Sequence, residues 1–256
     1  RKISSCYRFS YEFSPKYAEE PIHIEFSFDI NSAFQQRVFA IIGENGVGKT
    51  QLITALPLDL AKRRENLFAP QVPLYSKVIA VSTSLYDSFD VPKNSVGFNY
   101  VYCGLACGKK DNKTILAPKE LKLKLLQTTK TINGRERAES LKNILSPLYS
   151  ADIISALFTI QEEKIKVNQA RLVEIVDYMS SGESSLLFIF CNIVANIRYD
   201  SLILFDEPET HLHPNAITSL MSSIYQLLDE YQSYAIIVTH SPLIIREMRS
   251  TGVRIM

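Results

Sequence analysis

The stretch Gly43-Glu44-Asn45-Gly46-Val47-Gly48-Lys49-Thr50 decides how this chain folds. It fits the pattern GxxxxGK[ST], it follows the short apolar run Arg37–Ile42, and a helical pattern runs from Lys49 to about Leu60. Glycines let the backbone N–H groups of such a loop turn inward around phosphate oxygens, and the N-terminus of the following helix adds a favourable dipole. We therefore expect a strand, a phosphate-binding loop and a helix, in that order.

Each polar side chain of this loop has an expected role. Lys49 is expected to reach the β- and γ-phosphates of a nucleotide, and the Thr50 hydroxyl is expected to ligate Mg²⁺. The alternative, an accidental glycine-rich turn, arises by chance in about one chain in a hundred of this length, and the strand–loop–helix context makes it rarer. The predicted nucleotide-binding residues are Gly43, Glu44, Asn45, Gly46, Val47, Gly48, Lys49, Thr50 and Gln51.

Two acids follow a second apolar run. Leu202-Ile203-Leu204-Phe205 leads directly into Asp206 and Glu207. Ligands of α/β sheets bind at the carboxyl ends of the strands, where both acids would lie. We expect Asp206 to hold Mg²⁺ through water and Glu207 to orient or deprotonate the water that attacks the γ-phosphate of ATP. The alternative is a strand that simply ends in solvated acids. The phosphate-binding loop upstream favours the functional interpretation instead.

Strand and helix patterns alternate along the chain. Strands are predicted at 5–13, 22–30, 77–81, 201–205 and 234–239, and helices at 183–198 and 215–231. A helical pattern also fills Pro118 to about Tyr178. This order predicts one α/β domain over residues 1–256, with a largely parallel, mixed sheet covered on both faces and a helical insertion at about 105–178.

Two further motifs resemble those of ABC-type ATPases. Met179-Ser180-Ser181-Gly182-Glu183 resembles the LSGGQ/LSGGE signature, and it lies one helix before the carboxylate strand, as in that family. Val238-Thr239-His240-Ser241-Pro242 resembles the family's switch histidine, so His240 is expected to contact the γ-phosphate. The resemblance implies that Ser180, Ser181, Gly182 and Glu183 bind the nucleotide held by a second subunit. A serine-rich helix cap is the alternative.

The segment between these motifs narrows the resemblance. Pro208-Glu209-Thr210-His211-Leu212-His213-Pro214 takes the place of the D-loop, and the wording DEPExHLHP resembles the SMC/RecF/OLD-like clade, including ATPases of bacterial antiphage systems such as Septu and retron-linked relatives. This implies a homodimer or higher oligomer that clamps two ATP molecules and controls an effector such as a nuclease, in defence or DNA-linked processes. A metal site at His211 and His213 lacks an evident third ligand.

One departure from the ABC pattern bears on function. The family carries a glutamine after an early strand, whereas this chain continues Ser82-Thr83-Ser84-Leu85-Tyr86-Asp87. The ATPase subunit of a membrane transporter therefore stays the second hypothesis. A scaffold that binds ATP without hydrolysing it is a third, and the intact Lys49, Asp206 and Glu207 argue against it.

Positive charge gathers in the insertion. Residues 109–142 hold ten Lys or Arg against four acids, so this segment carries +6 and the rest of the chain −5. The asymmetry predicts an anionic partner, either nucleic acid or an acidic protein. A solvated helical face explains the same charges equally well. The basic residues are Lys109, Lys110, Lys113, Lys119, Lys122, Lys124, Lys130, Arg135, Arg137 and Lys142.

Composition suits a globular protein of the cytoplasm. Hydrophobic residues make up 46% and charged residues 21%, which is ordinary for a soluble domain. The most apolar run, Leu186–Ile197, is too short to span a bilayer, which needs about 20 residues, and the first residues resemble no signal peptide. Four cysteines without paired CxxC motifs predict free thiols. The lack of an initial Met suggests a piece of a longer protein.

Overall fold

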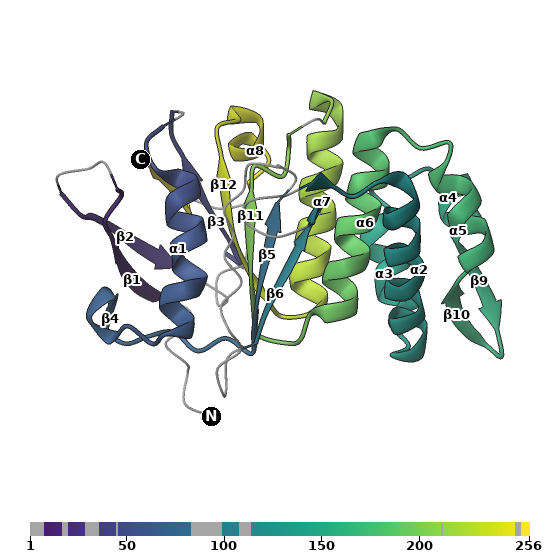
Figure 1. Ribbon diagram of the computed structural model, residues 1–256, viewed down its shortest axis with the longest axis horizontal. Helices are drawn as coiled ribbons and strands as arrows, with labels where there is room; N and C mark the ends of the chain where they lie inside the picture. Colours follow the sequence, from purple (N-terminus) through teal and green to yellow (C-terminus); the bar gives the residue numbers. More distant parts are fainter. Residues whose placement is uncertain are drawn as a thin grey trace.

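A parallel sheet forms the centre of the molecule. The computed structural model describes residues 8–16, 20–28, 36–44, 46–82, 99–107, 114–210, 212–248 and 252–256. The central sheet has six strands in the order β13-β3-β12-β11-β5-β6, and every neighbouring pair is parallel (Figure 1). Its strands are β3 (Val38–Ile42), β5 (Lys77–Ser82), β6 (Tyr100–Gly104), β11 (Ser201–Asp206), β12 (Tyr234–Thr239) and β13 (Val253–Ile255).

Both faces of this sheet are covered, which explains the continuous apolar runs in the sequence. Every residue of β5, β11 and β12 is buried. Successive side chains of a strand point to opposite faces, and β11 shows this directly. Leu202 and Leu204 belong to one hydrophobic core, and Ile203 and Phe205 belong to the other. The α/β class with a parallel central sheet is therefore confirmed.

The first core lies under helix α1 (Lys49–Ala61) and a separate antiparallel sheet. This sheet has the order β2-β1-β4, with β1 (Arg8–Phe13), β2 (Ile22–Ser27) and β4 (Phe68–Ala69), beside a 3-10 helix at Glu65–Leu67. The sequence predicts one mixed sheet; in the structure the antiparallel strands form their own layer. Their inward aromatic side chains, among them Phe9 and Tyr11, pack against the central sheet. The Tyr11 hydroxyl also donates to Asp59 in α1 at 2.6 Å.

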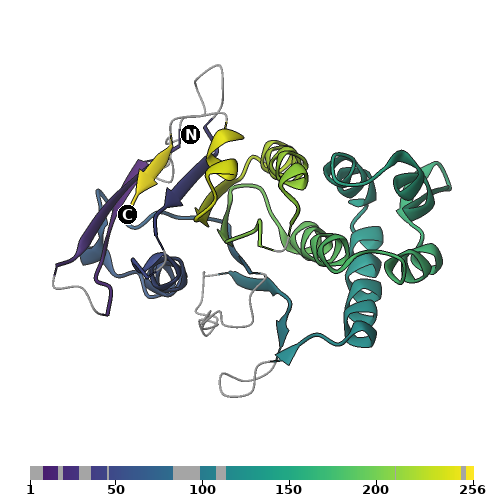
Figure 2. The same ribbon diagram turned by 90° about the horizontal axis from the view of Figure 1, so that it is seen from above.

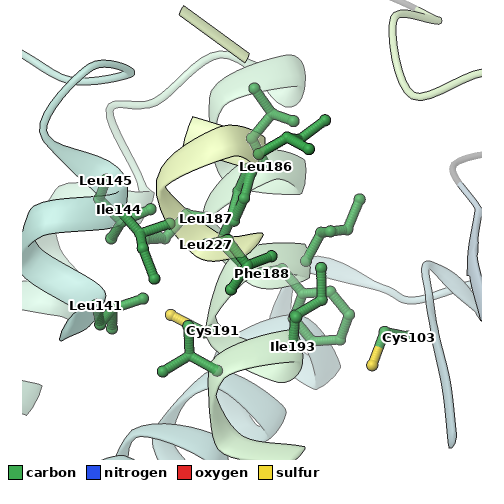
Figure 3. Close-up of a cluster of buried hydrophobic side chains, with 14 of the residues drawn as sticks. Cys103, Leu141, Ile144, Leu145, Leu186, Leu187, Phe188, Cys191, Ile193 and Leu227 are labelled. Carbon is green, nitrogen blue, oxygen red and sulfur yellow. The ribbon is translucent and has the colours of Figure 1, made fainter. Parts of the chain in front are cut away.

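The second core lies under the helices of the other face. Figure 3 shows side chains of α6, α3 and α7 meeting there, with Phe188 and Cys191 of α6 beside Leu141 and Leu227. Viewed from above, α6 and α7 lie between the central sheet and the four helices α2 to α5 (Figure 2). The helices are α2 (Pro118–Gly134), α3 (Ala138–Leu145), α4 (Ala151–Leu157), α5 (Gln169–Val176), α6 (Ser181–Asn196), α7 (Pro214–Glu230) and α8 (Pro242–Arg246).

The segment predicted to be a helical insertion contains a β-hairpin that the sequence does not predict. Strands β9 (Phe158–Gln161) and β10 (Lys164–Val167) pair antiparallel within the stretch expected to be helical throughout. Glu162 and Glu163 form its turn with φ of 51° and 61°. Two consecutive left-handed residues are what a tight hairpin needs, but Asn and Gly are the usual choices there. A short ribbon of β7 (Ala106–Cys107) and β8 (Thr114–Ile115) precedes α2.

Two cysteines lie in the second core as free thiols. Cys103 and Cys191 are buried and unpaired, as predicted for them, and burial raises the pKa of each thiol to about 12. At neutral pH both side chains are therefore neutral and behave as small apolar groups.

Candidate functional site

The phosphate loop forms where the sequence predicts it, between β3 and α1. Gly46 and Gly48 have φ of 93° and 97°, in the left-handed region that favours glycine. Gly48 is also the N-cap residue of α1. A Cβ atom at Gly43 would lie 2.7 Å from the carbonyl oxygen of Met256, so the close approach of β13 also requires glycine. Asn45 lies outside the described residues.

Lys49 is held inside this loop. Its side chain is 5% exposed. Its Nζ donates to the carbonyl oxygens of Gly43 and Glu44, both at 2.7 Å. These contacts keep an ammonium group against the backbone that a phosphate would meet. Gln51 faces elsewhere, because its Oε1 accepts from the backbone N–H of Lys16 at 3.1 Å.

Asp206 ends β11 beside the first turn of α1. Its side chain is 5% exposed, and its Oδ1 has no hydrogen-bond partner among the described residues. Burial raises the pKa of Asp206 to about 6, with Glu207 and Glu209 adding to the rise, while a hydrogen bond from Thr50 and the charge of Lys49 lower it. A buried carboxylate with a free oxygen next to a hydroxyl suits a hard cation, so Thr50 and Asp206 fit Mg²⁺.

Glu207 and His240 come together from neighbouring strands. The Nδ1 atom of His240 lies 3.1 Å from Oε1 of Glu207, and both side chains are partly exposed. Glu207 has φ of 45°, a strained conformation for a residue with a side chain. Its backbone N–H donates to the carbonyl oxygen of Val238 at 2.9 Å, which keeps the ends of β11 and β12 together. The pair therefore lies at the carboxyl edge of the sheet.

A buried acid, for which the sequence predicts no role, also lies at this edge. Glu209 is 7% exposed and accepts a hydrogen bond from the Thr239 hydroxyl. Burial raises the pKa of Glu209, and the bond from Thr239 lowers it. The signal available in the sequence was an acid three residues after Asp206 and a threonine directly before His240.

The signature segment begins α6 as a closed capping box. Ser180 Oγ accepts from the Glu183 N–H at 3.3 Å, and Glu183 Oε2 accepts from the Ser180 N–H and hydroxyl at 2.8 and 2.7 Å. The helix-cap alternative therefore describes the local geometry well. Ser181 and Gly182 form the first turn of the helix.

A cavity of about 520 Å³ opens beside the signature. It lies between the starts of α6 and α7 and has both polar and apolar walls. Its lining residues are Leu148, Tyr149, Ser180, Ser181, Gly182, Glu183, Leu186, Leu212, His213, Asn215, Ala216 and Ser219. None of them belongs to the phosphate loop.

The predicted site residues therefore fall into two groups. Lys49, Thr50, Asp206, Glu207 and His240 lie together around the start of α1 and the ends of β11 and β12. Helix α1 covers one face of the central sheet and α6 the other, as their separate cores show (Figure 1). Within one chain, the helix that follows the signature and the helix that follows the phosphate loop thus pack on opposite faces of the sheet.

His213 has a structural contact. It is the N-cap residue of α7, and its Nδ1 accepts from the Asn215 N–H at 3.4 Å. His211 lies outside the described residues, and the described part of the chain holds no group of three or more His, Cys, Asp or Glu placed to bind a metal.

Part of the basic segment serves the fold. Arg135 donates to the carbonyl oxygen of Ala195 at 2.6 Å, and Arg137 donates to those of Val194 and Ile197 at 2.7 and 2.9 Å. These guanidinium groups satisfy the last carbonyls of α6 and favour the negative end of its dipole.

Other basic residues divide between ion pairs and open surface. Lys122 pairs with Asp177, whereas Lys119, Lys124 and Lys130 are exposed. The described residues do not include Lys109, Lys110 or Lys113, nor the stretch 83–98, which contains most of the segment that replaces the glutamine of the ABC pattern.

Within the described ranges, no helix is both long and apolar enough to pass through a bilayer. The apolar run of the sequence is α6, whose buried residues pack in the second core.

The fold and the site define a P-loop ATPase domain of the ABC type. More particularly, the chain belongs to the family described as "AAA domain, putative AbiEii toxin, Type IV TA system", which matches residues 58–246. The match begins within α1 and includes the signature, the carboxylate strand and His240. The chain is therefore an ATP-binding P-loop ATPase of this family.

Individual relatives agree with this assignment. Protein Ea59 of Escherichia phage lambda is 27% identical over 277 residues, which cover 94% of this chain and 52% of Ea59. The chain thus spans about half the length of that relative. Among solved structures, CbiO1 of Clostridium perfringens, part of an ABC transporter complex, has a TM-score of 0.50 at 15% identity, over 98% of this chain and 84% of that chain. At this identity, the likeness shows a shared fold.

Proposed function

We propose that this chain hydrolyses ATP as a switch subunit and works as a dimer around two nucleotides. Lys49 and the loop backbone would bind the β- and γ-phosphates, and Thr50 and Asp206 would hold Mg²⁺. The bound cation would neutralise charge that develops on the phosphate oxygens. His240 would contact the γ-phosphate and distinguish ATP from ADP.

The contact between Glu207 and His240 carries this proposal. It places a carboxylate and an imidazole together at the strand ends, next to the loop that would hold the γ-phosphate. Glu207 would accept a proton from water while the water oxygen forms a bond to the γ-phosphorus. The bond between that phosphorus and the bridging oxygen of ADP breaks, and ADP and phosphate result.

The position of the signature supports the dimer. Ser180 and Lys49 lie on opposite faces of the sheet in one chain, so a site that contains both needs two subunits. Two copies arranged head to tail would each place the start of α6 against the other's phosphate loop. The N–H groups and hydroxyl groups there favour an anion.

The relatives suggest the setting. The family description mentions the AbiEii toxin of a type IV toxin–antitoxin system, and Ea59 is a phage protein. The motif wording resembles ATPases of antiphage defence. We therefore place the ATP cycle in control of an effector, such as a nuclease, in phage–host conflict. Similarity to a transporter ATPase concerns the fold alone and does not favour the transport hypothesis.

Two substitutions test the chemistry. Lys49→Ala should abolish nucleotide binding, because it removes the charge at the β- and γ-phosphates. Glu207→Gln should keep binding and slow hydrolysis by about 100-fold or more, because an amide cannot accept the proton. Phosphate release and binding of a fluorescent ATP analogue measure the two steps separately.

A matched control comes from the β9–β10 turn. Glu162→Gln makes the same chemical change at an exposed residue and should leave turnover unchanged. Normal hydrolysis by Glu207→Gln would disprove the role given to this carboxylate. Wild-type protein that binds ATP without turnover would favour the scaffold hypothesis.

A further inference from the structure

Glu209 joins the two strands that carry the catalytic pair. It follows β11 in the turn that leads to α7, and its Oε1 accepts from the hydroxyl of Thr239, the last residue of β12. Thr239 Oγ1 in turn accepts from the backbone N–H of Ser241 at 2.9 Å. The residue between these two anchored positions is His240.

Burial of the Glu209 carboxyl group costs free energy that a purely structural residue would avoid. A buried carboxyl group loses hydration, and it regains little unless its oxygens are paired. Glu209 is 7% exposed, and its Oε2 has no hydrogen-bond partner among the described residues. An apolar side chain would fill this position at lower cost, so packing does not account for the acid.

The geometry of the neighbouring pair does account for it. Glu207 contacts His240. Glu209, two residues after Glu207, contacts Thr239, the residue directly before His240. The two contacts tie the turn after β11 to the turn after β12.

We infer that Glu209 is a positioning residue, which holds Thr239 and thereby sets the His240 ring against Glu207. This inference rests on the proposed ATP hydrolysis. Glu209 itself touches no reacting atom in this scheme. It acts through the hydroxyl of Thr239, as supporting side chains do in many sites, where their loss costs about 10- to 100-fold.

Conservative and disruptive variants distinguish a positioning role of Glu209 from a contribution to folding stability alone. Glu209→Ala and Thr239→Val each remove the contact and should lower kcat about 10-fold with little change in KM. Glu209→Gln keeps an acceptor oxygen and Thr239→Ser keeps the hydroxyl, so both should stay within about threefold of the wild type. The double variant Glu209→Ala/Thr239→Val should be no slower than either single variant, because both lose the same contact.

A second background shows whether the effect passes through His240. With His240→Ala already present, Glu209→Ala should cause no further loss of kcat. An equal 10-fold loss in both backgrounds would overturn the inference, and so would unchanged turnover of a folded Glu209→Ala protein. The urea unfolding midpoint shows whether each variant folds. If Glu209→Ala does not fold, Glu209→Gln and Thr239→Val take its place in the test.

A readout without turnover separates this inference from the proposed function. The imidazole signals of His240 in a ¹H–¹⁵N spectrum should shift in Glu209→Ala and return in Glu209→Gln, whereas those of His23, on β2, stay fixed. Unmoved His240 signals would overturn the positioning role even if ATP hydrolysis is established. Shifted signals in a protein that fails to hydrolyse ATP would instead count against the proposed function.

Discussion

The Nδ1 atom of His240 and the Oε1 atom of Glu207 lie 3.1 Å apart, although the two residues are separated by a strand and a helix in the sequence. The distance makes them one unit, in which the imidazole fixes the direction of the carboxylate. Their partial exposure leaves room for water and substrate.

Loss of this imidazole should slow hydrolysis and spare binding. His240→Ala removes the group that contacts Glu207 and that, in the proposed function, also contacts the γ-phosphate, so kcat should fall by about 10- to 100-fold. Steady-state phosphate release gives kcat, and analogue binding gives the affinity. His23→Ala, an exposed histidine of the antiparallel sheet, is the control and should hydrolyse normally. Equal rates for both variants would contradict the pairing.

Arg137 should contribute to the free energy of unfolding and very little to nucleic-acid binding. Its guanidinium donates to two carbonyl oxygens at the end of α6 and lies over the ring of Tyr231, 5.6 Å from the ring centre. Arg137→Ala should lower the free energy of unfolding by about 2 kcal/mol. Lys130→Ala removes the same charge from an exposed position of α2 and should change it by less than about 0.5 kcal/mol. Urea denaturation compares the two, and equal midpoints would refute the capping role.

The exposed lysines of α2 give the nucleic-acid hypothesis its sharpest test. Neutralising Lys119 and Lys124 with Gln should weaken binding of a DNA or RNA duplex and flatten its dependence on salt, because fewer counterions are released. Lys122 should contribute less, since it pairs with Asp177. Filter binding at several salt concentrations measures the slope.

The control for this test is Lys164→Gln on the β9–β10 hairpin. Lys164 is paired with Glu136, so its loss should leave binding unchanged. Absence of binding by the wild-type protein at low salt would support the solvated-face interpretation of these charges.

The sequence predicts those parts of the fold that depend on local pattern. Buried parallel strands read as continuous apolar runs, and β11 and β12 are found within one residue of their expected ends. The loop before Lys49 is predicted because its glycines permit conformations that other residues avoid. Asp206 and Glu207 follow from the rule that ligands bind at strand ends.

Features that depend on distant contacts escaped prediction. Arg137 reaches carbonyl groups 57 and 60 residues away, whereas the local sequence predicts only an interaction surface or a solvated face for its charge. Glu209 acquires its role only when β11 and β12 lie side by side. The hairpin turn at Glu162 and Glu163 carries no glycine or asparagine, and tertiary contacts of the strands replace the local signal.

The composite site gives the strongest test of the whole scheme. Ser180 is the N-cap of α6, which packs on the face of the sheet opposite α1, so in the proposed dimer its hydroxyl meets the γ-phosphate bound by the second subunit. Ser180→Arg puts a bulky side chain where that phosphate would lie. The variant should still bind ATP at Lys49, but it should neither dimerise with ATP nor hydrolyse it. Light scattering and phosphate release measure the two effects.

Mixing Ser180→Arg with Lys49→Ala subunits makes the argument specific. A mixed dimer has one site in which an intact Lys49 faces an intact Ser180, and another in which both are changed. The mixture should therefore recover part of the hydrolysis that neither variant shows alone, because the γ-phosphate at the intact site again meets the start of α6. Glu162→Gln mixed with Lys49→Ala controls for simple dilution of active subunits. Normal hydrolysis by Ser180→Arg alone would show that each chain completes its own site, and a silent mixture that still forms mixed dimers would show that one intact site does not suffice.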